Sequence, residues 1–170
     1  MTQRSNAAGK KKQQEARITL RDQLWEGEIE EISLWDRKKH DGFTTIPRTM
    51  PQIFRIMDKE ADKGKPVSGT YFSLWCNVWD ENFIEIKDKK RFAFEAGFSG
   101  ERAVTAWTSR MRKLEEIGFI SSRSGVQGEF NYIIIINPLH VIKSIYKDRN
   151  KDDLYNALLG RMNEVKAKFD

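Results

Sequence analysis

The segment that most constrains the fold spans residues 89–136, where two helical patterns are followed by two strand patterns. The clearest pattern is an apolar residue at every third or fourth position, which predicts an α-helix with one buried stripe. Gly118 follows the stripe directly and is the residue type that most often ends a helix. The segment therefore predicts a helix that ends at residue 117. The stripe consists of Val104, Trp107, Met111, Leu114 and Ile117.

Shorter elements flank this helix on both sides. Ala93 and Gly97 stand four residues apart, which predicts a short preceding helix that closes in a glycine turn. Ser99 is expected to cap the long helix. Residues 119–136 hold two extended runs around a glycine-containing turn, which predicts a β-hairpin. Residues 83–86 predict a short strand that pairs with this hairpin.

This order of elements resembles the winged helix-turn-helix superfamily of DNA-binding domains over about residues 80–137. The resemblance rests on the Ala-x3-Gly spacing, on the stripe that ends in Leu114-x3-Gly118-Phe119-Ile120, and on the hairpin, which corresponds to the wing. It implies a mainly α fold with a small antiparallel β wing. In that superfamily the second helix reads the DNA groove, and the wing contacts the DNA backbone or minor groove.

Candidate DNA-binding residues lie on three elements. Residues at the start and on the outer face of the long helix are expected to meet base edges or nearby phosphates. Basic residues that begin the preceding helix are expected to hold phosphates with help from its N-terminal amides, although a solvated lysine cluster is the alternative. The candidates are Lys89, Lys90 and Arg91 on the first helix, Ser99, Arg102, Thr105, Ser109 and Arg110 on the second, and Arg123 and Gln127 on the wing.

The N-terminal segment is the most basic part of the chain. Residues 1–21 hold six basic side chains against one acid, among few large apolar residues. This composition predicts a flexible, disordered arm that can neutralise phosphates, and the alternative is an arm that only keeps the protein soluble. We expect three segments: a basic arm over residues 1–16, a winged-helix domain with an N-terminal extension over residues 17–147, and an amphipathic helix over residues 148–170.

A second apolar stripe runs through this C-terminal segment, from Leu154 to Phe169. Asp152 or Asp153 is expected to cap its helix. The stripe either folds back on the same domain or pairs with its copy in a second subunit. We favour a homodimer through this helix, because a two-fold pair suits a palindromic DNA site.

The composition predicts a soluble protein that is attracted to polyanions. The 170 residues are 39% hydrophobic and 32% charged, with a formal net charge of +5. No apolar run approaches the roughly 20 residues of a membrane helix, and no hydrophobic leader follows Met1. Cys76 is the single cysteine and has no partner within the chain, which favours a reducing, cytoplasmic location without membrane contact.

The sequence gives little support for catalysis or metal binding. His40 and His140 are the only histidines, and no Cys or His pair has the spacing of a metal site. Residues 64–70 lack two of the positions that a phosphate-binding loop requires. We therefore expect no enzyme activity, no metal and no cofactor.

Together these patterns predict a sequence-specific double-stranded DNA-binding protein that acts as a transcriptional regulator. A plasmid or phage replication or partition factor is the alternative within the same binding class. An adaptor whose winged helix docks another protein is the alternative from a different class, because the same fold serves several functions.

Overall fold

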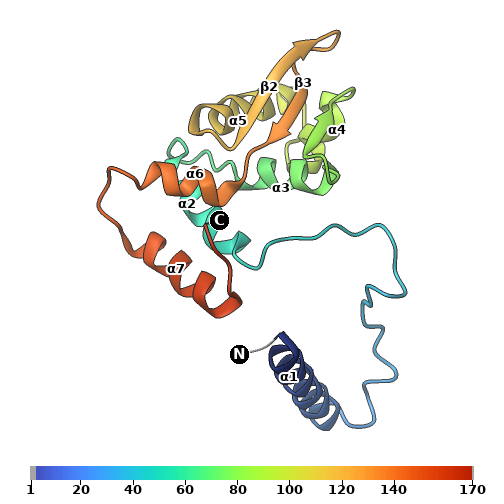
Figure 1. Ribbon diagram of the computed structural model, residues 1–170. Helices are drawn as coiled ribbons and strands as arrows, with labels where there is room; N and C mark the ends of the chain where they lie inside the picture. Colours follow the sequence, from blue (N-terminus) through green and yellow to red (C-terminus); the bar gives the residue numbers. More distant parts are fainter. Residues whose placement is uncertain (1–2, 170) are drawn as a thin grey trace. The chain divides into compact units, whose positions relative to one another are not determined.

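The computed structural model describes residues 3–169, which form two compact units divided between Phe43 and Thr44. In the first unit, the helix α1 (Gln3–Leu24) is followed by turns and irregular chain. The second unit is mainly helical with a small antiparallel sheet, as the sequence predicts. Its elements are α2 (Met50–Glu60), α3 (Ser68–Asn77), β1 (Phe83–Glu85), α4 (Lys89–Glu95), α5 (Ala103–Ile117), β2 (Ile120–Gly125), β3 (Gly128–Ile135), α6 (Pro138–Ile145) and α7 (Asp153–Val165) (Figure 1).

α1 occupies the segment for which the sequence predicts a disordered arm, so that prediction is wrong from residue 3 onward. Ala, Gln, Lys and Arg dominate the segment, and all four have high helix propensity. Every side chain from Lys11 to Arg21 is exposed. Local backbone hydrogen bonds therefore hold most of α1, with little burial to support them.

The C-terminal helix α7 packs on α2 of the same unit. Leu158 and Met162 of its stripe are buried, and Asp152 caps the helix by accepting a hydrogen bond from the backbone N of Tyr155 at 3.0 Å. The predicted cap is confirmed. Part of the stripe is therefore covered within one chain, while Leu154 and Leu159 stay half-buried, and the homodimer through this helix stays a prediction.

The boundary between the two units lies after Phe43, so residues 17–43 group with α1. α7 lies in the second unit and shares a core with α2. Among the described residues, none of the helices has the length and apolarity needed to cross a bilayer.

In the sheet, β3 is the central strand and pairs antiparallel with both β1 and β2. The predicted strand at residues 83–86 therefore forms, over Phe83–Glu85, and pairs as expected. Ile133 and Ile135 of β3 are buried toward the core, while Ile134 between them faces outward, as the alternation of a strand requires.

This alternation fails at Phe130 and Asn131, which are consecutive in β3 and both buried. Two features accommodate the irregularity. Phe130 adopts a φ of 59°, and the pairing register shifts between Arg123 and Gly125 of β2. The ring of Phe130 lies edge-on to Trp107 of α5, with centroids 6.2 Å apart. The hairpin and α5 therefore share one core.

Candidate nucleic-acid interface

Two short motifs fix the two ends of α4. Asp88 caps α4, and its side chain accepts hydrogen bonds from the backbone N of Lys90 at 2.9 Å and of Arg91 at 3.1 Å. Gly97 follows α4 with a φ of 90°. The expected use of the α4 amides as phosphate donors is thus contradicted, because the Asp88 carboxylate already occupies them.

α5 begins later than the sequence predicts. Its first residue is Ala103, and Arg102 stands at the N-cap position without a side-chain cap. Ser99 is therefore not the cap, because the chain first turns through Gly100, whose φ is 79° and whose carbonyl accepts from the backbone N of Ala103. Ser99 and Arg102 are both exposed in or beside this turn.

The predicted end of α5 is confirmed. Gly118 adopts a φ of 98°, and its backbone N donates to the carbonyl of Glu115 at 3.0 Å. The backbone N of Phe119 donates to the carbonyl of Leu114 at 2.9 Å. This pair of bonds is the Schellman arrangement that a glycine permits, and it turns the chain into β2.

Burial of one stripe orients α5. Trp107, Met111 and Leu114 are fully buried. Because successive helical residues are about 100° apart, Thr105, Ser109 and Arg112 share the opposite face. Thr105 and Arg112 are exposed and Ser109 is half-buried, so this face is polar and turned to solvent.

Arg110 does not belong to the outward face, although the sequence analysis places it among the DNA-binding residues. Its Nε donates to the carbonyl of Pro66 at 3.0 Å, and its guanidinium lies 5.6 Å from the ring centroid of Phe98. Both contacts belong to other parts of the same unit. Arg110 therefore ties α5 to the loop before α3 and to the α4–α5 turn.

Arg112, and not Arg110, lies on the outward face of α5. It is not among the DNA-binding residues predicted from the sequence. Its Nε and Nη2 donate to the two carboxylate oxygens of Glu129 in β3, at 2.9 and 2.7 Å. These bonds hold the pKa of Glu129 below its usual range and raise that of Arg112. The available signal was helical spacing, because Arg112 lies seven residues after Thr105 and three after Ser109.

The basic residues of α4 have different surroundings. Lys90 is exposed and Lys89 is half-buried. A β-carbon placed on Gly128 would lie 3.9 Å from Nζ of Lys89, so this lysine reaches the end of the hairpin. Arg91 instead donates to Glu95 at 2.6 Å and to Asn77 at 3.1 Å. These bonds direct its guanidinium toward Asn77 of α3, which leaves the two lysines as the better candidates for phosphate contacts.

The β2–β3 hairpin projects past α4 and α5 (Figure 1). Its tip is Val126 and Gln127, both exposed, and Arg123 is exposed on β2. Asn131 supports the hairpin, since its Nδ2 donates to the carbonyl of Ile86 at 3.0 Å. Arg123 and Gln127 therefore stand on a supported element beside α5.

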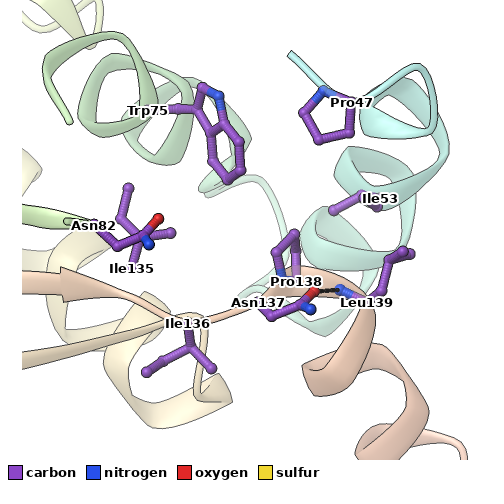
Figure 2. Close-up of a pocket in the computed structure, with 9 residues that line it drawn as sticks. All are labelled: Pro47, Ile53, Trp75, Asn82, Ile135, Ile136, Asn137, Pro138 and Leu139. Carbon is purple, nitrogen blue, oxygen red and sulfur yellow. Dashed lines mark hydrogen bonds between the residues drawn. The ribbon is translucent and has the colours of Figure 1, made fainter. Parts of the chain in front are cut away.

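A separate cavity of about 340 Å³ lies between α2, α3 and the end of β3 (Figure 2). Its walls are mostly apolar, with Trp75 of α3 facing Pro47, and with the side-chain amides of Asn82 and Asn137 at its edge. Asn137 already accepts from the backbone N of Leu139 at 3.0 Å. None of the predicted DNA-binding residues lines this cavity.

Comparisons with protein-family models, with curated proteins and with solved structures find no match to this chain. Over residues 3–169, no group of three or more His, Cys, Asp or Glu side chains is arranged to hold a metal ion. The arrangement of α4, α5 and the hairpin is therefore the principal guide to function.

Proposed function

We propose that the second unit is a winged helix-turn-helix domain that binds double-stranded DNA, with α5 as the reading helix and the β2–β3 hairpin as the wing. The orientation of α5 carries this proposal. Trp107, Met111 and Leu114 of its apolar stripe are fully buried, and a polar face with Thr105, Ser109 and Arg112 is turned to solvent beside the hairpin. The major groove of B-DNA admits one α-helix presented in this way.

The charges around α5 favour a nucleic acid over a protein partner. Arg102 precedes the helix, Lys90 lies on α4 and Arg123 lies on β2, and all three are exposed. A positive charge on each of three adjoining elements suits contacts to phosphates on either side of a groove. Such a domain acts by occupying a DNA site, and transcriptional regulation is the simplest consequence.

The test begins with the DNA itself. Fragments of the source genome that the protein retains at moderate salt should share a sequence element. Promoter fragments would support a regulator, whereas a replication or partition site would support the alternative role. A short duplex of that element then serves for affinity measurements by fluorescence anisotropy. Absence of duplex binding at low salt would contradict the proposal.

The reading helix is tested with the double variant Arg102→Ala/Thr105→Ala. We expect its affinity for the specific duplex to fall about tenfold or more, because base contacts of arginine are worth that much discrimination. Arg55→Ala is the matched control, since it removes one exposed charge from α2. Unchanged affinity in the double variant, combined with weaker binding in the Lys11→Gln/Lys12→Gln variant, would assign the DNA contacts to α1 instead.

A further inference from the structure

We propose, on the basis of the DNA-binding function proposed above, that Arg112 and Lys89 form a binding site for one DNA phosphate, and that the Glu129 carboxylate occupies this site in the DNA-free protein. Three elements meet there. Lys89 is the first residue of α4, Arg112 lies on the outward face of α5, and Glu129 is the second residue of β3.

The geometry at Arg112 is that of an anion site. Two guanidinium nitrogens donate in parallel to two oxygens of one carboxylate, at 2.9 and 2.7 Å. A DNA phosphate is tetrahedral, but its two non-bridging oxygens can accept the same pair of donors. The fork of Arg112 that binds the carboxylate therefore also suits a phosphate.

Lys89 adds a second cation to the same anion. Its charge helps to lower the pKa of Glu129, after the stronger effect of the Arg112 hydrogen bonds. Its Nζ also lies beside Gly128, the residue before Glu129. A phosphate in the place of the carboxylate would thus meet one bidentate arginine, with the charge of Lys89 nearby at the end of the hairpin.

The bond between Arg112 and Glu129 is easy to exchange. The side chains are 62% and 43% exposed, so water screens their attraction and the pair contributes little to folding. If Glu129 stayed in place, its charge would repel a DNA backbone that lies between α5 and the hairpin. Binding therefore replaces the carboxylate instead of adding to it.

The first test uses Glu129→Gln in the full chain. Once a duplex is known, we expect this variant to bind about two- to fivefold more tightly, the range expected for removing one exposed ion pair. The slope of log affinity against log salt should change by less than about 0.9, the value for one whole phosphate contact, because the contact with Arg112 forms in both proteins. Equal or weaker binding would mean that the pair only positions the hairpin, which would overturn the proposal.

Two controls separate a site from a general change of charge. Glu164→Gln removes a carboxylate from another Arg–Glu pair, with Arg161 in α7, and should leave affinity unchanged. In an Arg112→Gln background, the gain from Glu129→Gln should disappear, because the two residues act on the same phosphate. The same gain in that background would overturn the proposal.

A second measurement does not depend on DNA. In Glu129→Gln, millimolar inorganic phosphate should shift the Nε–H resonance of Arg112 in an NMR spectrum, and the native protein should respond less. An unshifted Arg112 resonance in the variant would overturn the phosphate site. Failure of duplex binding in the native protein would instead count against the proposed function, so the two failures are distinguishable.

Discussion

The helices α1 and α5 are both basic and polar, yet they differ in what holds them. α1 exposes every side chain from Lys11 to Arg21, whereas α5 buries Trp107 and Met111 completely. A buried stripe fixes the rotation of a helix, and charge alone does not. α5 therefore presents its outward side chains at defined positions, whereas α1 has no buried stripe to fix the positions of its basic side chains.

The largest expected effect is a loss of folding stability when a buried residue of α5 is truncated. Trp107→Ala should lower the free energy of unfolding of the second unit by about 3–5 kcal/mol, because it removes a fully buried indole and leaves a cavity. Urea denaturation followed by circular dichroism measures the change. Trp79→Ala is the control, since Trp79 is 79% exposed, and a similar loss in both variants would contradict the role of burial.

The next effect is a loss of stability when the packing of α7 on α2 is weakened, and it also tests the predicted homodimer. Leu158→Ala should lower the free energy of unfolding by about 2–5 kcal/mol, because Leu158 is fully buried in the core that α7 shares with α2. Leu24→Ala in α1 removes an exposed side chain and should change stability by less than about 0.5 kcal/mol. Light scattering tests the predicted homodimer: a dimer that Leu158→Ala dissociates would support it, and a monomer at all concentrations used would contradict it.

A smaller effect tests whether α1 contributes charge without specificity. Lys11→Gln/Lys12→Gln should weaken binding to specific and unrelated duplexes by the same factor. The slope of log affinity against log salt should become shallower by up to about 0.9 for each lysine. Anisotropy at several salt concentrations measures both quantities. Lys38→Gln/Lys39→Gln is the matched control outside the helix, and a loss confined to the specific duplex would give α1 a reading role.

The smallest effect is a pH dependence in the second unit. Lys59, the backbone N of Tyr155 and the Tyr146 hydroxyl lower the pKa of Asp152 to about 2 from 3.8. The folded pKa is depressed, so the stabilisation is complete above about pH 4 and is lost as pH falls through 2. The melting temperatures of native protein and Asp152→Asn should therefore converge between these values. Asp153→Asn should follow the native curve, and a constant gap down to pH 2 would contradict the assignment.

Features that depend on local spacing could be predicted from the sequence. The stripe through Trp107 and the glycine at 118 determine the end of α5, because periodicity and a left-handed turn are properties of neighbouring residues. The same holds for the strand at Phe83 and for the Asp152 cap. No knowledge of distant contacts was needed for these elements.

Features that depend on distant residues could not. Arg110 is bound by Pro66 and Phe98, and nothing in its own surroundings in the sequence indicates those partners. The stripe of α7 showed that a partner exists but not that the partner is α2. α1 is a different case. Its charge predicts disorder, but its helix propensity, which is also a local property, favours the helix.

One consequence follows from Gly125. A β-carbon there would collide with the side chain of Asn131 and lie 2.6 Å from Cε2 of Tyr132, so only a glycine fits beside the hairpin tip. If the domain binds DNA as proposed, this close packing supports the shape of the hairpin, and a duplex that contacts both α5 and the hairpin would adapt its groove width to them. Sequences whose base steps deform at low cost would be retained over stiffer ones, even at positions that no side chain touches.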